Sequence, residues 1–420
     1  MTKRKFSIGN SFFDHHLSRN SILVDKTLLI KEILEDNSDV ILITRPRRWG
    51  KTLNLSMLHY FFDYPVTRDG VLDQEKYALK KERFSKLKIG AYPNIIDDHC
   101  GKYPTLFISF KDIKEKNYDD LLSDIRGLIS KVYSKHKYLL RSPQIDETDK
   151  AQFKKYLDRT IEKSEIQESL RFLSSLLHTH FDRKVVILID EYDTPMNDWY
   201  VHALSKENTA EGVELLQQIL DLFRGILGAA LKDNSSLERA AITGILRIAK
   251  SSLFSGLNNI REDCLLNKRY APHFGFTEEE VRGLLQECDR TETDMEDVKQ
   301  WYNGYTIGGI TIYNPWSIVN YVDEHELQGY WTGTASTELL EQALILDDFQ
   351  EELQTLIEGG TVSMIADPKM VFADIQASSE ALYNLLLFSG YLTVVEVEFG
   401  KGGTYNCILR IPNKEILEIL

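Results

Sequence analysis

Short apolar runs rich in β-branched residues alternate with longer segments of helical periodicity through the first part of the chain. The runs are "DVILIT" (39–44), "PTLFISF" (104–110), "KVVILIDEYD" (184–193) and "RAAITGIL" (239–246). Short runs that are apolar at nearly every position, without alternating polar residues, are typical of strands buried on both faces of a parallel sheet. The helical segments between them, such as 117–136 and 211–231, supply the crossovers that parallel strands require. This alternation predicts an α/β fold, a three-layer parallel sheet with helices on both faces.

The pattern changes past residue 272. "TEEEVRGLLQEC" and "DMEDVKQWYNGY" read as short helices, the first with Thr277 and Glu280 at the spacing of a capping box. The glycine-rich "YTIGGITIYNPWS" is typical of two strands joined by a turn. Helical segments follow, "STELLEQALIL" and "ALYNLLLFSGY", and then an alternating hairpin that turns at Gly400–Gly403.

These changes divide the chain into four expected parts. They are an N-terminal lead segment (1–38), an α/β core (39–272), a helical lid with a β excursion (273–334) and a winged-helix-like C-terminal unit (335–420).

Composition narrows the class of protein. Of the 420 residues 43% are hydrophobic and 27% are charged, which is ordinary for a folded chain. No apolar leader and no run of about 18 apolar residues is present in the sequence, so we expect a cytoplasmic protein without a membrane partner. The four cysteines are far apart and match neither a zinc template nor a disulfide framework, which suits a reducing compartment. A net charge of −14 argues against a surface that embraces nucleic acid all round, and the basic run 76–88 is interpreted as a solvated helix face.

The segment "TRPRRWGKTLNLS" (44–56) lies between the first apolar run and a helical segment. A phosphate-binding loop needs converging main-chain N–H groups, a helix N-terminus, a lysine for the phosphates and a hydroxyl for the metal. Gly50, Lys51 and Thr52 occupy those places. Arg45, however, stands where such a loop usually has its first glycine, and Pro46 lacks an N–H. The segment is therefore either a modified phosphate loop or a basic surface turn that ends in Gly-Lys-Thr.

An acidic pair follows the third apolar run. The strand-like part "VVILID" ends in Asp190 and Glu191 comes next, which places both carboxylates at the C-terminal edge of a parallel sheet, where ligands bind in open α/β folds. An aspartate there can hold Mg²⁺, and the glutamate can polarise an attacking water. A strand that merely ends in an acidic helix cap would look the same. The two signals together, in this order and context, favour a nucleotide site.

Six separated blocks of the chain extend this interpretation. They are "ILVDKTLLIKEIL", "ILITRPRRWGKTLNLSMLHYFF", "VVILIDEYDTPM", "AAITGILRIAKSSLFSGLNNI", "WYNGYTIGGITIYNPWSIVNYV" and "LLLFSGYLT". In this order they resemble the AAA-ATPase-like family of bacterial P-loop proteins, from near residue 7 to the C-terminus. The loop of that family typically reads RPRR(F/W)GKT, so the resemblance implies that Arg45 is the family's own variant of a cofactor-binding loop. Members commonly carry a C-terminal PD-(D/E)XK nuclease-like domain, and this sequence ends about where such a domain would begin.

The resemblance implies a P-loop NTPase fold and a role for each matching residue. Lys51 and Thr52 would bind phosphate and Mg²⁺, Asp190 would bind Mg²⁺, and Glu191 would act as the base. Thr243 would be a polar sensor at the end of its strand. Arg247 and Lys250 could meet γ-phosphate charge or be ordinary surface residues. Arg47 and Arg48 could replace the missing loop donors or grip a neighbouring acidic element.

Other residues give weaker signals. His15 and His16 have no metal-ligand spacing and are expected at the surface. Asp25 and Lys26 could lie near adenine or ribose, or simply at an exposed helix start. Aromatic residues at 302, 305 and 316 could stack on bases, but packing of the lid onto the core is the favoured interpretation.

Two functions follow. The first is an ATPase that binds Mg-ATP and whose hydrolysis gates a partner, naturally a nuclease domain, fused or supplied by another chain. The alternative is a nucleotide-dependent switch with little or no hydrolysis, suggested by the altered loop. Nuclease activity of this chain itself is not expected, because "DPKM" at 367 has no acidic companion at the right place. A nucleic-acid partner is predicted only from the winged-helix-like tail and the resemblance, and the sequence leaves oligomerisation open.

Overall fold

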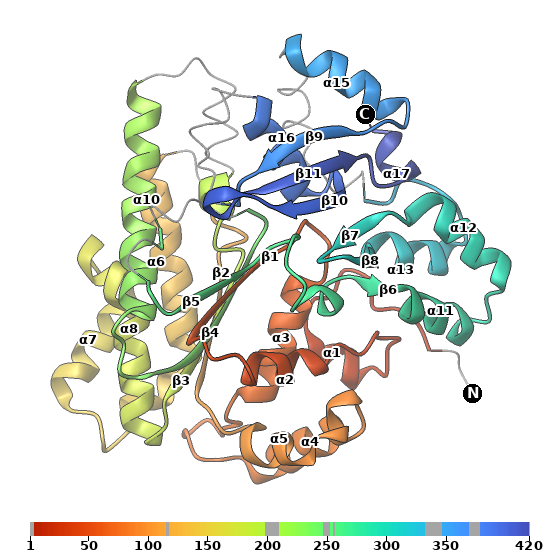
Figure 1. Ribbon diagram of the computed structural model, residues 1–420. Coiled ribbons are helices and arrows are strands. Elements are labelled where there is room, and N and C mark those ends of the chain that lie inside the picture. Colours follow the sequence, from red (N-terminus) through yellow and green to blue (C-terminus); the bar gives the residue numbers. More distant parts are fainter. Residues whose placement is uncertain are drawn as a thin grey trace.

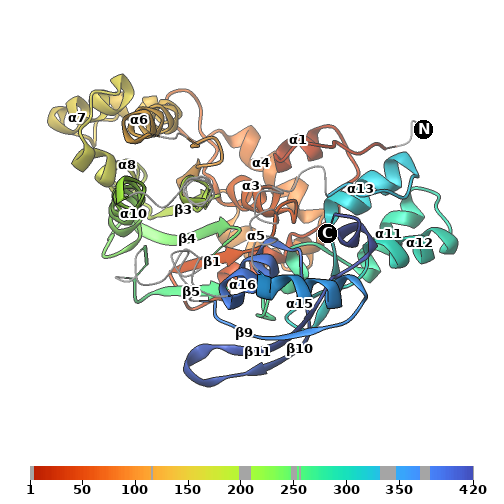
Figure 2. The same ribbon diagram turned by 90° about the horizontal axis from the view of Figure 1, so that it is seen from above.

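The computed structural model describes residues 4–114, 117–197, 210–246, 253–254, 257–331, 347–368 and 379–419. Its centre is a five-stranded sheet in the order β2-β3-β4-β1-β5, with every neighbouring pair parallel. The strands are β1 (Val40–Thr44), β2 (Thr105–Ser109), β3 (Val185–Asp190), β4 (Leu237–Gly244) and β5 (Ile260–Asp263). The predicted α/β class is confirmed, and Figure 2 shows β3, β4, β1 and β5 following one another across the molecule.

Helices cover both faces of this sheet (Figure 1). One face carries α1 (Phe13–Ser18), α2 (Leu28–Leu34), α3 (Lys51–Phe62), α4 (Gln74–Ser85), η1 (Lys88–Ala91) and α5 (Pro93–His99). The other carries α6 (Tyr118–Ser134), η2 (Lys137–Arg141), α7 (Glu147–Asp158), α8 (Lys163–Phe181) and α10 (Ala210–Leu231). Asn117 is the N-cap of α6, and its side chain accepts a hydrogen bond from the Asp120 N–H.

Successive residues of one strand enter different cores. In β1, Ile41 and Ile43 pack with the α3 side, whereas Val40 and Leu42 pack with the α8 and α10 side. Strand side chains alternate with a period of two, so a strand that serves two cores must be apolar throughout. This is the physical reason for the uninterrupted apolar runs in the sequence.

The part of the chain after β5 builds two small antiparallel sheets. The first has the order β6-β8-β7 and packs with helices α11 to α13, and the second has the order β10-β11-β9 and packs with α15 and α16. The first group comprises η3 (Ala271–His273), β6 (Phe276–Thr277), α11 (Glu278–Glu287), α12 (Glu292–Tyr302), β7 (Tyr305–Ile307), β8 (Ile310–Tyr313) and α13 (Pro315–Glu324). The second comprises α15 (Asp347–Ile357), β9 (Val362–Ala366), α16 (Ser379–Ser389), β10 (Thr393–Phe399), η6 (Lys401–Gly403), β11 (Tyr405–Arg410) and α17 (Lys414–Leu417).

Several predicted elements in this half are present. Thr277 and Glu280 form the capping box of α11, β7 and β8 form the strand–turn–strand excursion, and β10 and β11 form the hairpin. The whole of "STELLEQALIL" (336–346) lies outside the described residues. The lid, the winged-helix-like unit and the four boundaries stay predictions.

The basic run 76–88 lies mostly on α4 and is largely exposed, as predicted, except that Lys80 is buried and its ammonium donates to the carbonyl of Asp63. The exposed alternative for Lys26 and the surface position of His16 are wrong. Lys26 is buried too, with its ammonium between the Pro272 carbonyl (2.7 Å) and the carboxylate of Glu280. His16 is buried against the carbonyl of Asn10. Long basic side chains can bury their stems and find a partner inside, and sequence spacing does not reveal that partner.

No helix within the described ranges is long and apolar enough to cross a membrane.

Candidate functional site

Asp190, the last residue of β3, is the centre of a cluster of hydroxyl groups. Its side chain is fully buried. Thr52, at the start of α3, donates to Oδ2 at 2.9 Å, and Thr243, near the end of β4, donates to Oδ1 at 2.7 Å. Ser109, at the end of β2, also donates to Oδ2, at 3.3 Å. The parallel strands end at one edge of the sheet, so the structure brings together Thr52, Asp190 and Thr243, which lie far apart in the sequence.

The loop between β1 and α3 places Lys51 beside this cluster. Gly50 has φ +77°, a left-handed conformation that favours glycine, and α3 begins at the next residue. The Lys51 ammonium is buried and donates to the carbonyls of Arg45 (2.9 Å) and Pro46 (2.8 Å). Burial lowers the pKa of Lys51, although the nearby carboxylates, Glu191 first among them, act in the opposite direction.

Glu191 follows the strand in an unusual backbone conformation. Its φ is +49°, which a residue with a side chain rarely adopts. Burial raises the pKa of its carboxyl group above the ordinary value, while the charge of Lys51 opposes that shift. Thr194 donates to Oε2 at 3.4 Å. The raised pKa makes the Glu191 carboxylate a stronger proton acceptor than an exposed glutamate.

Asp193 is a part of the site that the sequence analysis missed. It is fully buried, and its Oδ2 accepts hydrogen bonds from the N–H groups of Ile245 and Leu246, both at 2.8 Å. Asn197 donates to the same oxygen at 2.7 Å. Burial raises the pKa of the carboxyl group. Asp193 therefore ties the segment after β3 to the segment after β4, and the signal for it was the second aspartate in "DEYD".

Arg45 does not join the cluster around Asp190. Its guanidinium is fully buried and donates to Asp263 Oδ1 at the end of β5, at 2.6 Å, and to the Thr44 carbonyl at 2.8 Å. It also lies 5.4 Å from the ring centroid of Phe274. Arg45, at the position where such loops usually have their first glycine, thus forms a buried ion pair that joins the loop to the edge strand β5. This contact differs from the phosphate contact that was expected of Arg45.

Two further arginines of the loop are held by tryptophans. The Arg48 guanidinium lies 4.3 Å from the ring centroid of Trp316, and burial lowers its pKa. The Arg47 carbonyl accepts a hydrogen bond from Trp331 Nε1 at 3.1 Å. Arg247 and Lys250, the remaining basic residues predicted for the site, lie outside the described residues.

The weaker candidates have structural partners. Asp25 accepts hydrogen bonds from the N–H groups of Thr27 and Lys88 and so fixes the chain at α2 and η1. Tyr302 and Tyr305 are buried, which agrees with packing rather than exposed stacking. Within the described ranges, no group of three or more His, Cys, Asp or Glu side chains could hold a metal ion.

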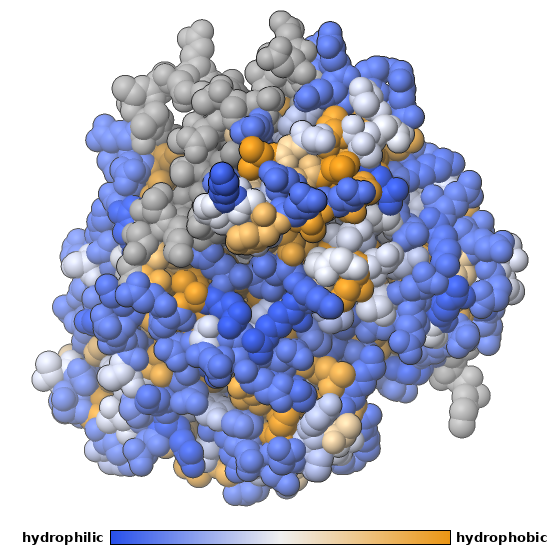
Figure 3. Space-filling view, in the orientation of Figure 1, coloured by the Kyte–Doolittle hydropathy of each residue, from blue (hydrophilic) through white to orange (hydrophobic). Residues whose placement is uncertain are grey.

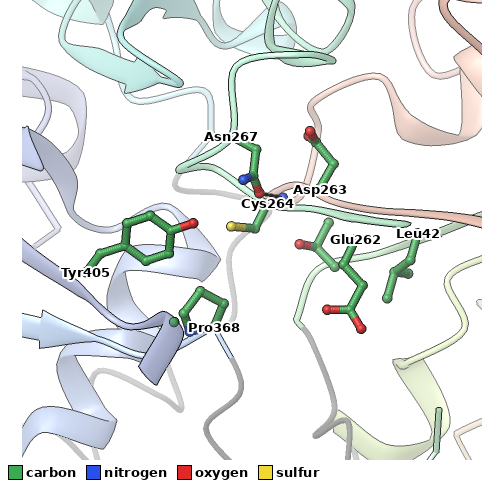
Figure 4. A pocket seen from close by; sticks show the side chains of 9 residues that line it. Leu42, Glu262, Asp263, Cys264, Asn267, Pro368 and Tyr405 are labelled. Carbon is green, nitrogen blue, oxygen red and sulfur yellow. Dashed lines mark hydrogen bonds between the residues drawn. The ribbon is translucent and has the colours of Figure 1, made fainter. Parts of the chain in front are cut away.

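A cavity of about 150 Å³ lies next to the loop, between the end of β5 and the β9–β11 sheet (Figure 4). Its lining includes Thr44 and Asp263 on the core side and Pro368 and Tyr405 on the C-terminal side. A cavity of this size can hold about one aromatic ring. It is lined by none of the residues around Asp190, so it lies beside the start of the β1–α3 loop and is separate from that cluster.

A parallel sheet flanked by helices, with Gly-Lys-Thr at a helix start and an aspartate at the end of another strand, is consistent with the class of P-loop proteins. The family model described as "Predicted AAA-ATPase" matches residues 7–254, and the chain belongs to this AAA-ATPase-like family. The chain is also similar to a curated protein described as "Uncharacterized protein in vnfD 5'region", from Azotobacter chroococcum mcd 1. The two are 25% identical over 423 residues, which cover 99% of this chain and 69% of the other protein.

Proposed function

We propose that this chain is a Mg²⁺-dependent ATPase that binds ATP at the loop 45–52. The observation that carries the proposal is the hydrogen-bonded set Thr52–Asp190–Thr243 beside the buried ammonium of Lys51. Membership of the AAA-ATPase-like family also supports nucleotide binding.

The loop would hold the phosphates. The N-terminus of α3 offers main-chain N–H groups and the positive end of the helix dipole. Lys51 would exchange its bonds to the Arg45 and Pro46 carbonyls for bonds to phosphate oxygens. Arg47 and Arg48 would supply side-chain donors at the loop surface, while Arg45 would hold the loop from behind through Asp263.

The residues present fit a magnesium ion. The Thr52 hydroxyl and the Asp190 carboxylate lie 2.9 Å apart, and both are hard oxygen ligands of the kind that Mg²⁺ uses together with phosphate and water. When bound, the ion would neutralise charge on the phosphates. Ser109 and Thr243 would keep the Asp190 carboxylate oriented.

Glu191 would accept the proton of the attacking water, because its carboxyl group is partly desolvated and follows Asp190 directly. Thr243 would report on the site to the segment after β4, which Asp193 holds by two main-chain N–H groups. Arg247 would meet the charge of the γ-phosphate.

ATP turnover would gate a partner activity, and a nuclease domain or protein is our proposed partner. The curated relative is longer than its match to this chain, which leaves room for an additional part in that protein. Nucleic-acid binding remains a separate proposal, and no retardation of DNA or RNA at low salt, where charge contacts are strongest, would contradict it.

Binding and turnover of Mg-ATP by wild type, Lys51→Ala and Glu191→Gln test the proposal. Lys86→Ala, which removes an exposed lysine, is the matched control. We expect Lys51→Ala to bind ATP at least about 10-fold more weakly, since it loses charged hydrogen bonds. Glu191→Gln should keep its affinity and lose about 10²- to 10⁴-fold in turnover, the usual contribution of a general base.

Two outcomes would redirect the assignment. Equal ATP affinity in wild type and Lys51→Ala would reject the nucleotide site. Lys51-dependent affinity with near-zero turnover that Glu191→Gln leaves unchanged would favour the nucleotide-dependent switch.

A further inference from the structure

Four consecutive residues of the phosphate loop contact four different places in the C-terminal half. Pro46 lies against Gly390, where an added β-carbon would sit 3.0 Å from Pro46 Cβ. The Arg47 carbonyl accepts from Trp331, the Arg48 guanidinium lies over Trp316, and Trp49 meets Tyr305 edge-on at 4.9 Å between ring centroids. The loop is therefore enclosed by elements that follow the ATPase core in the sequence.

Trp331 is the most firmly held of these contacts. Its side chain is 1% exposed and packs edge-on against Tyr391. Its main-chain N–H donates to Glu415 Oε1 at 2.7 Å. The Glu415 carboxylate, on α17, is itself buried and accepts from the Ser317 hydroxyl on α13. Contacts within the C-terminal half therefore hold both the main chain and the ring of Trp331, in addition to its hydrogen bond to the loop.

The bond from Trp331 to the loop constrains a peptide plane. A trans peptide is planar, so the carbonyl of one residue and the N–H of the next point in opposite directions. The Arg47 carbonyl points to the Trp331 indole, and the Arg48 N–H therefore points to the opposite side of the loop. Loops of this kind bind phosphate by main-chain N–H groups. A wrongly turned peptide at 47–48 would present a carbonyl oxygen in place of a donor.

We propose that Trp331 is a positioning residue for the nucleotide, which it serves by orienting the Arg47–Arg48 peptide of the phosphate loop. The inference rests on the proposed function, because it requires that the loop bind phosphate. Trp331 acts through the loop and does not touch the ligand. Coupling between two sites is reciprocal, so nucleotide bound at the loop also stabilises the contact with Trp331 and, behind it, α17 and the β10–β11 hairpin.

The test compares Trp331→Phe with Trp301→Phe. Both variants remove one indole, but Trp301 lies on α12, where Lys414 covers its ring. The Kd for Mg-ATP and the hydrogen exchange of residues 379–419, with and without Mg-ATP, are measured for each. We expect Trp331→Phe to bind ATP about 2- to 12-fold more weakly, the value of one hydrogen bond, and to lose the ATP-induced protection that wild type and Trp301→Phe show.

Replacement of Trp331 by benzothienylalanine keeps the ring shape and removes only the N–H donor, which guards against a misfolded phenylalanine variant. It should reproduce the loss of affinity and of protection. The inference is overturned if this variant behaves like Trp301→Phe while Lys51→Ala still loses ATP. If wild type itself binds no ATP, both the proposed nucleotide site and the positioning role of Trp331 are rejected. This result can be told apart from the previous one, because no variant then differs from wild type in ATP binding.

Discussion

The residue that departs most from a usual phosphate loop, Arg45, is also the most completely buried charge of the loop. Its guanidinium pairs with Asp263 and lies near Phe274. Burial raises the pKa of Asp263 in spite of this pairing. Both charges have left water, so each depends on the other more than a surface pair would.

Restoring the usual glycine should therefore harm the protein. Arg45→Gly leaves the Asp263 carboxylate buried without its partner, and we expect unfolding stability to fall by about 3 to 5 kcal/mol. Urea unfolding followed by circular dichroism measures the change. A variant as stable as wild type would show that the pair does not hold the loop.

The double variant Arg45→Met, Asp263→Leu is the control. Replacing both charges by apolar side chains leaves no unpaired buried group and is often close to neutral. It should recover most of the stability that the single substitution loses.

At the scale of elements, the sequence predicts the interior of the core well and its edge poorly. Strands β1 to β4 contribute to two cores, and each contains an apolar run that identifies it in the sequence, although β4 begins with the charged pair Glu238–Arg239. The edge strand β5 reads "IRED", and its Asp263 and Arg261 make ion pairs rather than a hydrophobic pattern. Lys51, Thr52 and Asp190 were predicted from motif and position, and Thr243 from the family resemblance. Ser109 and Trp331 were not predicted, because each acts through a tertiary contact that leaves no local pattern, and Asp193 was missed although it is the last acid of "DEYD".

The short helix α17 carries a buried acid with a pH-dependent cost. Burial raises the pKa of Glu415 from 4.5 to about 7. A carboxyl group whose pKa is raised by folding contributes stability that is complete below its unfolded pKa and is lost as pH rises through its folded pKa. As the pH rises from about 4.5 to about 7, this group should lower the free energy of unfolding of wild type by about 3 kcal/mol.

Glu415→Gln should remove that component. Glutamine keeps an oxygen acceptor for the Trp331 N–H and Ser317 hydroxyl but has no proton to lose in this range. Urea unfolding of both proteins across the interval should show the variant gaining on wild type as pH rises. A constant difference between the two would mean that Glu415 is not the titrating group.

At the scale of the whole molecule, His273 stands where the N-terminal segment, the core and the C-terminal half meet. It is buried, its carbonyl accepts from Asn54 on α3 at 2.8 Å, and burial, with the charges of Lys26, Lys88 and Arg45, lowers its pKa from 6.5 to about 3. A histidine whose pKa is lowered by folding contributes stability that is present above its unfolded pKa and is lost as pH falls.

Mild acid should therefore loosen this junction. As the pH falls from about 7.5 to about 5, His273 should lower the free energy of unfolding of wild type by about 2 kcal/mol. The free energy of unfolding of His273→Gln should fall by that much less over the same interval. Urea unfolding at the two pH values gives the difference, from which groups common to both proteins cancel. Equal losses in the two proteins would contradict the assignment.

The surface seen in Figure 3 is largely hydrophilic, with apolar side chains gathered over the C-terminal sheet. Ile365, Val395, Val397 and Phe399 are the exposed large hydrophobic residues of that sheet. In Figure 1 the sheet lies beyond the end of the central sheet that carries Asp190 and the phosphate loop.

The enclosure of residues 46–49 by Gly390, Trp331, Trp316 and Tyr305 also bears on how such chains evolve. A change at one loop position must be matched by a change in a segment more than 200 residues away, as the sequence separations of 256 for Trp49–Tyr305 (305 minus 49) and 284 for Arg47–Trp331 show. Loop and C-terminal half should therefore be inherited as one unit. Exchanging the C-terminal half between distant members of the family would separate each loop from the aromatic partners with which it was selected.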